Sequence, residues 1–463
     1  MKKIIYSIII AIALLGSLNS CSKDSLEPTL AQQKAVETSI TTLEDLQGIL
    51  YGVYNRITAT AYYGRDFIIY GEIRSDNAFA NGNSGRFLTA SEMDMGESDG
   101  YASGTWTSIY QVIASANILI SQDATSFEGD AAEINHIIGQ AYAIRAFAHF
   151  DLLKLYGQQH VTAGGTLGVP YIMEYKGDDL TPARNSVTEV KGFIEADLDM
   201  ALSLMTASLN DGSKQFFTTY GIHGLKSRVA LYFGDWSTVI TAAETVINSG
   251  LYSIIPEADF VASWPADGAG NSILELAYSS TDNNNINGLA YIYRGVSYGD
   301  IQALDDLVSI FDAGDVRVSA AMLGVDVGGS DVLANIGKYP SMDFSDNISL
   351  IRYEEVILNY AEALFETGSV ANALTVLNQI TAERGANSYA AATKANIIQE
   401  RRRELCFEGF RFDDLARTGS DIPLVSPFQQ THGGPAYGSF KYAFPIPKVE
   451  LNANSNMVQN EGY

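Results

Sequence analysis

The sequence predicts a mostly α-helical protein: a scaffold of tetratricopeptide-like helical hairpins, with long loop-rich insertions and a few short strands. Three observations lead to this prediction. Apolar residues recur at helical spacing over many segments. Two pairs of these segments are separated by a glycine-containing turn. Three long stretches between them are rich in Gly, Asn, Ser and Tyr. A generic helical bundle is the alternative that periodicity alone leaves open.

The first predicted helix covers residues 43–57, where Leu43, Leu46, Leu50 and Ile57 lie on one apolar stripe. Further helices are expected at 106–120, 131–156, 188–205, 218–233, 236–249, 351–367 and 370–384. Gly234 and Gly368 interrupt the last two pairs, and each pair then has about the size of a tetratricopeptide unit, roughly 34 residues.

Three loop-rich stretches, residues 62–101, 252–305 and 423–463, separate the helices. Short strands are expected within them, for example at 273–278. Loops of this length in a compact domain are usually functional, so we expect the binding residues there.

The composition limits the classes of function. The hydrophobic fraction of 46% supplies an ample core, and the formal net charge is −25. Residues 1–20 carry two lysines and no acid, so their removal lowers the net charge to −27. Phosphate backbones need Lys and Arg, so nucleic acid is excluded as a partner. Of the two cysteines, Cys406 is expected to be a small buried hydrophobe, and no disulfide framework is predicted.

The N-terminus has the pattern of an exported lipoprotein. Lys2 and Lys3 precede an apolar segment, residues 4–16, that is too short to span a bilayer comfortably. Leu18-Asn19-Ser20-Cys21 then looks like a lipobox, in which Cys21 would be lipidated. This divides the chain into a lipoprotein signal peptide (1–20), a lipid-anchored tether (21–40) and a single helical binding domain (41–463). An ordinary signal peptide is the alternative.

Residues 400–419 contain the densest charge pattern of the chain, Glu400-Arg-Arg-Arg-Glu-Leu-Cys-Phe-Glu-Gly-Phe-Arg-Phe-Asp-Asp-Leu-Ala-Arg-Thr-Gly419. It reads as a helix that ends at Gly409 and restarts at Asp413. The spacing predicts three i,i+3 ion pairs along that path: Glu400/Arg403, Arg401/Glu404 and Glu408/Arg411. We therefore expect these charges to be structural.

This charged segment resembles the C-terminal signature of the SusD/RagB family, nutrient-binding lipoproteins on the outer surface of certain Gram-negative bacteria. Four further segments are similar to family hallmarks and occur in the expected order: 140–157 with Gly168-Val169-Pro170, 228–236, 352–364 and 445–463. The resemblance covers nearly the whole mature chain. It implies a SusD-like helical domain on the outer membrane, held by a lipid anchor, with a SusC-like TonB-dependent transporter as its partner.

Enzymatic signals are weak. The five histidines form no His-Glu-x-x-His pattern, and neither a Gly-x-Ser-x-Gly elbow nor a phosphate-binding Gly-x-x-x-x-Gly-Lys-Ser/Thr loop occurs. The sequence therefore predicts a protein that is not an enzyme, and no metal or cofactor site is assigned. Calcium near Asp94, Glu97 and Asp99 is left open beside a solvated acidic loop, because the run lacks a full EF-hand spacing. A secreted glycosidase is the less favoured reading, because adjacent acids such as Asp305-Asp306 do not establish two carboxylates across a cleft.

Binding signals are stronger, because a sugar site combines an aromatic platform with Asn, Asp and Arg. The loop after the first helix supplies that mixture with Asp76, Phe79, Asn81, Asn83 and Arg86. A second candidate region runs to Tyr298 and contains Asn283, Asn284, Tyr291, Tyr293 and Arg294; Trp264 is a further candidate platform. The alternative is that the Asn/Gly runs are only turns and the Tyr residues only packing.

The sequence thus predicts a surface glycan-binding lipoprotein that delivers an oligosaccharide to the transporter. Starch-binding relatives carry Trp in the first loop, where this chain has only Phe79 and Phe87, so the glycan stays open. Peptide capture, as in the RagB branch, is the main alternative.

Overall fold

The computed structural model describes residues 40–162, 165–294, 298–325 and 332–463. The predicted signal peptide, most of the tether and Cys21 lie outside the described residues. The longer helices are α3 (Leu43–Ile57), α6 (Gly100–Ile120), α7 (Ala131–Tyr156), α8 (Val187–Leu204), α9 (Thr219–Phe233), α10 (Trp236–Asn248), α13 (Tyr353–Glu366), α14 (Val370–Ala382) and α15 (Lys394–Glu404). The shorter ones are α4 (Asp66–Ile73), α5 (Leu88–Ser91), α11 (Phe260–Ser263), α12 (Leu289–Arg294), α16 (Arg411–Arg417) and α17 (Lys448–Ala453).

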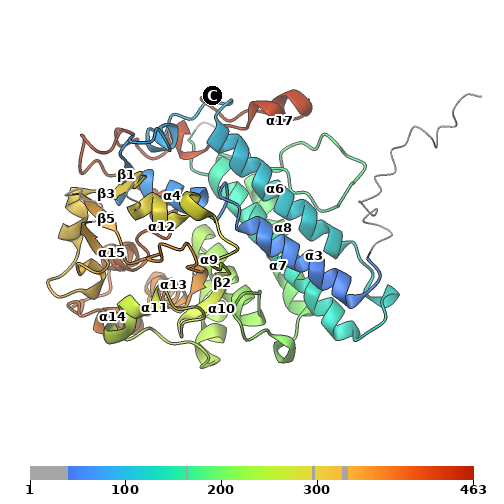
Figure 1. Cartoon of the computed structure of the whole chain (residues 1–463), viewed down its shortest axis with the longest axis horizontal. Helices are drawn as coiled ribbons and strands as arrows, with labels where there is room; N and C mark the ends of the chain where they lie inside the picture. The colour runs from blue at the N-terminus through green and yellow to red at the C-terminus, as the bar shows by residue number, and fades with distance from the viewer. Residues whose placement is uncertain (1–39, 163–164, 295–297, 326–331) are drawn as a thin grey trace, which may run out of the picture.

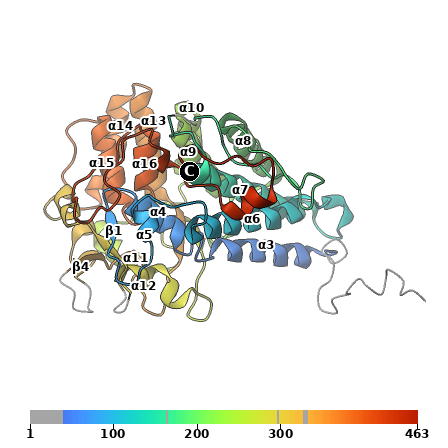
Figure 2. The same ribbon diagram turned by 90° about the horizontal axis from the view of Figure 1, so that it is seen from above.

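The helices form two groups that lie next to each other (Figure 1). In one group α7 packs against both α6 and α8, and α3 packs against α6. In the other, α9 and α10 form one hairpin and α13 and α14 form a second, with α10 against α13. Figure 2 shows α10, α13 and α14 on one side of the molecule, and α11, α12 and β4 on the opposite side. The predicted mostly helical fold with paired helices is confirmed. No helix in the described part of the chain is both long and apolar enough to span a membrane.

The described strands are short and pair two by two, all antiparallel. β1 (Ala78–Ala80) pairs with β3 (Ile301–Ala303), β2 (Ser272–Leu276) with β6 (Ile348–Arg352), and β4 (Leu323–Val325) with β5 (Leu333–Asn335). The strand expected at 273–278 is therefore β2, which begins one residue earlier and ends two residues earlier than expected. Its partner β6 takes the first residues of the helix expected at 351–367, which begins at Tyr353 instead.

Most predicted helix boundaries are confirmed within two residues, and the main exception has a clear cause. α6 begins at Gly100, six residues before the expected start, because the Asp99 side chain caps it by accepting a hydrogen bond from the Tyr101 N–H at 2.8 Å. α4 was not expected, since every one of its residues is buried and no periodic pattern results. Two adjacent aromatic residues, Tyr62 and Tyr63, lead into it.

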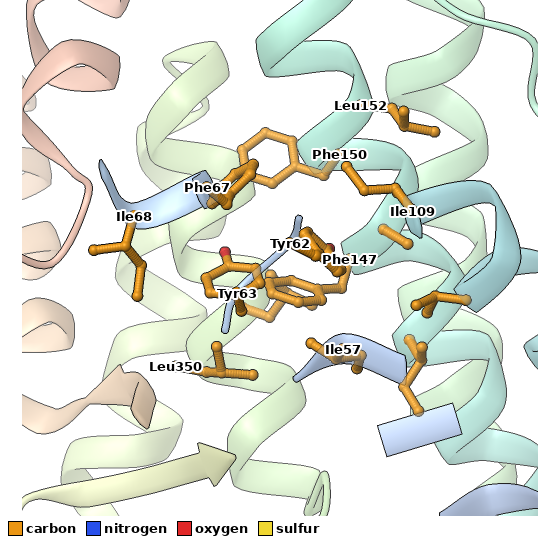
Figure 3. Close-up of a cluster of buried hydrophobic side chains, with 14 of the residues drawn as sticks. Ile57, Tyr62, Tyr63, Phe67, Ile68, Ile109, Phe147, Phe150, Leu152 and Leu350 are labelled. Carbon is orange, nitrogen blue, oxygen red and sulfur yellow. The ribbon is translucent and has the colours of Figure 1, made fainter. Parts of the chain in front are cut away.

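The centre of the core joins the first loop-rich stretch to α7. Figure 3 shows Tyr62, Tyr63 and Phe67 gathered around Phe147 and Phe150 of α7. Tyr63 stacks on Phe147 with ring centroids 5.2 Å apart, and the buried Tyr62 hydroxyl donates to Asp151 at 2.7 Å. This packing fixes α4, and with it the start of the segment that leads into β1.

The charged segment 400–419 is structural, as predicted, but two of its three predicted ion pairs are wrong. Glu400 and Arg403 do pair, at 3.7 Å. Arg401, however, binds Asp414 at 3.1 Å, and Glu404 lies between Arg317, Arg352 and Arg384 at 2.9–3.1 Å. Glu408 binds Lys338 and Arg352, and Arg411 binds Asp76.

The cause is burial. Arg401, Glu404 and Glu408 are at most 8% exposed, so their ion-pair partners come from other segments that pack against residues 401–408. The helix also ends at Glu404 rather than Gly409, and the chain turns through Phe407 and Gly409, both with positive φ, before α16. Cys406 in this turn is 3% exposed, as expected for a buried hydrophobe.

Candidate functional site

The two loops that the sequence singled out lie side by side, because β1 pairs with β3. Phe79 lies opposite Gln302, and Ala78 and Ala80 lie opposite Ala303 and Ile301. These two alanines and their partners Ala303 and Ile301 are buried on one face of the ladder. Phe79 and Gln302 are half-buried on its other face. The outward face of this ladder therefore brings residues 79–86 next to residues 298–302, which are far apart from them in sequence.

The charged segment 400–417 holds the start of this ladder in place. Arg402 donates to the Asn77 side chain at 2.8 Å, and Arg411 binds Asp76 at 2.6 Å. Next to them, α4 and the 407–409 turn make close contact: a Cβ on Gly71 would lie 2.0 Å from the Gly409 carbonyl oxygen. The charged segment thus fixes the position of the residues immediately before β1.

The Asn81 side chain organises the loop that follows β1. Its backbone N–H continues the ladder to the Asp300 carbonyl at 2.9 Å, and its amide donates to the Gly299 carbonyl at 2.7 Å. Its side-chain oxygen accepts the Asn83 N–H at 2.9 Å, which is an Asx-type turn. Asn83 itself is exposed at the loop tip, so it is free to meet a ligand.

Arg86 connects the loop after β1 to the second candidate region, around Tyr298. Its guanidinium carbon lies 3.9 Å from the centroid of the Tyr298 ring, and its nitrogens approach Asn287 at 3.3 Å and Asp300 at 3.5 Å. Burial alone would lower the pKa of Arg86, but the neighbouring Tyr298 and Asp300 raise it overall. The long distances and the 25% exposure of the side chain leave donor capacity for a ligand.

Two tyrosines form the aromatic side of this surface. Tyr291 of α12 meets Tyr298 edge to face with ring centroids 5.2 Å apart, and Phe344 lies 6.0 Å from Tyr291 on its other side. Both tyrosines are half-buried. We call the surface formed by Phe79, Asn81, Asn83, Arg86, Asn287, Tyr291 and Tyr298 the ladder site.

Burial argues against a ligand contact for two of the predicted residues. Asp76 is 2% exposed, and both of its carboxylate oxygens are bound by Arg402 and Arg411. Burial would raise the pKa of Asp76, but these two guanidinium groups lower it overall. Tyr293 is 1% exposed and stacks on Tyr339 with centroids 6.3 Å apart. Both side chains belong to the scaffold beneath the ladder site.

Three more predicted residues hold backbone segments together, and a fourth, Trp264, packs elsewhere. Asn283 donates to the Ser279 carbonyl at 2.7 Å, and Asn284 donates to the Thr58 carbonyl at 2.9 Å. Arg294 donates to the Pro340 carbonyl at 2.9 Å. Trp264 packs in a separate cluster with Phe260, with the Lys338 ammonium 4.7 Å from its ring centroid. The structure does not bring Trp264 into the ladder site.

Asn287 and Asp300 were missed. Both lie beside Arg86 in space because β1 pairs with β3, and no local sequence pattern predicts that pairing. The only sequence signal was their position within the loop-rich stretch 252–305.

A depression of about 620 Å³ lies elsewhere, between the α9–α10 turn and α15–α16. Tyr232, Trp236, Lys394, Arg417 and Ser420 line it. Its cations are already engaged, because Lys394 and Arg417 both bind Glu362 at 2.6 Å. We therefore favour the ladder site. Within the described residues, no group of three or more His, Cys, Asp or Glu is placed to hold a metal ion.

Comparisons with known proteins agree with this architecture. Residues 337–463 match the model of the SusD family, and residues 26–231 match a model described as "Starch-binding associating with outer membrane". The SusD-like protein P2 of Formosa agariphila is 26% identical over 98% of both chains. A putative sugar binding protein from Bacteroides vulgatus has a TM-score of 0.83 at 28% identity, covering 92% of this chain and 100% of its own. A laminarin binding SusD-like protein has the same fold, with a TM-score of 0.74 at 21% identity over 91% of this chain and all of its own.

The helical hairpins and the long loops between them give this protein the SusD-like helical fold. The chain belongs to the SusD/RagB family.

Proposed function

We propose that the protein is a surface glycan-binding lipoprotein that captures an oligosaccharide and delivers it to a SusC-like TonB-dependent transporter in the outer membrane. The observation that carries the proposal is the ladder site. It combines half-buried aromatic rings with the amides of Asn83 and Asn287 and the guanidinium of Arg86 on one surface. Rings of this kind cover the C–H faces of sugars, while amides and guanidinium groups donate to their hydroxyls.

The family comparisons support the same conclusion. One matching family model is described as starch-binding and as associating with the outer membrane, and one solved neighbour is a laminarin binding protein. The lipobox-like residues before Cys21 support a lipid anchor, with residues 1–20 as signal peptide, 21–40 as tether and 41–463 as binding domain.

Binding without catalysis is the favoured activity. Asp300, the carboxylate next to Arg86, is 1% exposed, so it is poorly placed to exchange a proton with a sugar at the surface. Asp76 is held as an ion pair with two arginines. A glycosidase needs two carboxyl groups that face each other across the scissile bond.

A glycan array and a peptide pool, probed in parallel with the protein from residue 22 onward, test the proposal. We expect binding to neutral or weakly charged oligosaccharides, because a net charge near −27 repels polyanions at long range. Calorimetry should then give modest affinity, about micromolar or weaker. Arg86→Ala serves as the site variant, and Arg56→Ala on the exposed part of α3 is its matched control.

Selective binding to peptides would replace the glycan proposal with peptide capture. Release of shorter sugars from a bound oligosaccharide on prolonged incubation would contradict the non-enzymatic activity.

A further inference from the structure

A pocket of about 240 Å³ lies between α3, α7 and the loop before α9. It shares no residue with the ladder site or with the 620 Å³ depression. α3 packs against α7, and the two helices lie next to each other in Figure 1. The side chains that give the pocket its polar and aromatic character are Tyr51 of α3, Glu133, His136 and Gln140 of α7, and Asp211 and Phe216 of the loop. The pocket is thus a separate candidate binding site.

Gln140 brings an unused amide group to this pocket, although the residue is only 6% exposed. The Phe217 N–H donates to the Tyr54 oxygen at 2.6 Å, so the Tyr54 hydroxyl gives its own proton to the Gln140 side-chain oxygen at 2.9 Å. These two bonds fix the orientation of the Gln140 amide. Its nitrogen has no acceptor within hydrogen-bond distance among the described residues, so two buried N–H donors are available to a ligand.

His136 adds a further unused donor one helical turn away. It is 5% exposed, and its Nδ1 accepts the Thr206 N–H at 3.4 Å. Burial lowers the pKa of His136, so the ring is neutral at pH 7 and carries its proton on Nε2. In the described parts of the chain, no acceptor lies within hydrogen-bond distance of Nε2. Because His136 and Gln140 are four residues apart on α7, their donors belong to one face of the helix.

The rest of the pocket is aromatic and acidic. Tyr51 is 54% exposed, and its ring centroid lies 5.4 Å from that of Phe216, so the two rings form an apolar wall. Glu133 and Asp211 border the pocket as exposed carboxylates. Of the residues that the structure describes, no Lys or Arg borders it. The pocket therefore combines buried donors for an oxygen atom with exposed carboxylates for a positive group.

We propose that this pocket binds an α-ammonium group next to a carbonyl oxygen, as carried by a free apolar or aromatic amino acid or by the N-terminal residue of a peptide. The carbonyl oxygen accepts from Gln140 and His136. The ammonium group faces Glu133 and Asp211, and the ligand side chain packs on the aromatic wall. This inference goes beyond the function proposed above and does not depend on it.

Other small ligands match the pocket less well. A neutral sugar has no positive group to face Glu133 and Asp211, and a metal ion would meet the N–H donors of Gln140 and His136. The volume of about 240 Å³ is below the roughly 300–1,000 Å³ of pockets for drug-sized ligands, so it suits a single amino-acid residue.

The test is calorimetry at pH 7 on the protein from residue 22 onward, with four probes: L-phenylalanine, L-phenylalaninamide, N-acetyl-L-phenylalanine and the tripeptide phenylalanyl-glycyl-glycine. We expect the first two to bind with a Kd of about 1 mM or tighter, because each carries the ammonium group and the carbonyl oxygen. N-acetyl-L-phenylalanine lacks the ammonium group and should bind about tenfold more weakly or not at all. Binding of the tripeptide would identify the peptide N-terminus as a source of the ligand, and its failure would identify the free amino acid.

Three variants locate the ligand. Gln140→Glu keeps an oxygen that accepts from Tyr54 and removes the amide donors, so it should weaken L-phenylalanine about tenfold. Glu133→Gln changes only an exposed side chain and should weaken it about threefold. Gln111→Glu adds the same charge as Gln140→Glu at an exposed position of α6 and is the matched control, with no expected effect. None of the three changes should alter glycan affinity, so this proposal and the proposed function fail independently.

Failure of the wild type to bind any of the four probes would overturn the proposal outright. Binding of N-acetyl-L-phenylalanine as tightly as L-phenylalanine would overturn the recognition of the ammonium group. Unchanged affinity in both Gln140→Glu and Glu133→Gln would place the ligand elsewhere and overturn the assignment of this pocket. An equal loss in Gln111→Glu would overturn it as well, because the effect would then follow the net charge.

Discussion

The guanidinium group of Arg86 stacks on Tyr298, with 3.9 Å between its central carbon and the ring centroid. Arg86 belongs to the loop after β1, and Tyr298 precedes β3, so this contact exists only when β1 and β3 pair. The stacking fixes the plane of the guanidinium and turns its nitrogens toward Asn287 and Asp300. A planar donor group and an aromatic ring are therefore held in a fixed relation before any ligand arrives.

Removing either partner of this stacked pair should weaken glycan binding. We expect Arg86→Ala and Tyr298→Ala each to lower affinity about tenfold, or ~1.4 kcal/mol, through lost donors and a lost ring face. The double variant should lose less than the sum, because each single change already breaks the contact. Calorimetry on the four proteins measures this coupling, and strictly additive losses would show that the two residues act separately.

Arg384 should be essential for stability. It is fully buried and donates to Glu404 at 2.9 and 3.0 Å and to Glu354 at 2.9 Å. Arg384→Ala leaves those carboxylates short of a partner, so the free energy of unfolding should fall by about 3–5 kcal/mol. Urea denaturation followed by circular dichroism provides the measurement. A variant as stable as the wild type would mean that water or a neighbouring cation replaces the guanidinium at no cost.

Arg403→Ala should separate stability from binding. Arg403 contacts Asp312 at 3.2 Å at the edge of the same network. We expect a lower melting temperature, with the glycan affinity of the folded fraction within about threefold of wild type, under ~1 kcal/mol. Thermal melts and calorimetry on one preparation give both values. A large loss of affinity at unchanged melting temperature would move this segment from the scaffold into the site.

The sequence was sufficient for the helices and insufficient for the contacts between segments. The boundaries of α7 were predicted to the residue, because Gly157 marks the end of a long uninterrupted run that favours a helix. The partners of Glu404 were not, because Arg317, Arg352 and Arg384 come from three other segments and i,i+3 spacing describes only one helix surface. Likewise, the candidate residues of both loops were chosen by composition. The pairing of the two loops was not predicted, because strands of three residues are too short to show an alternating pattern.

Stability should depend on pH through Glu362. Burial would raise the pKa of this carboxyl, but Arg417, Arg401 and Lys394 overcome it and lower the pKa to about 2. Because the folded-state pKa is below that of the unfolded chain, the stabilisation is complete above about pH 4.5 and is lost as the pH falls through that range toward 2. The difference in unfolding free energy between wild type and Glu362→Gln should therefore shrink between about pH 5 and pH 3. A difference that stays constant over this range would contradict the assignment.

Cys21→Ala should release the protein from membranes. The expectation rests on the lipobox-like residues Leu18 to Ser20, and Cys21 lies outside the described residues. Fractionation of cells that express the full chain, with incorporation of labelled fatty acid, measures the anchor; Ser22→Ala is the control. Undiminished membrane retention of the Cys21 variant would count against a lipid anchor.

The most direct measurement of the central claim, that the β1–β3 ladder forms the glycan site, is hydrogen–deuterium exchange of the unmodified domain with and without the oligosaccharide that the array identifies. We predict that added glycan slows exchange in residues 78–91 and 285–305 and leaves the α9–α10 turn unchanged. Protection confined to residues 231–236 and 394–420, which border the 620 Å³ depression, would place the ligand there and contradict the account.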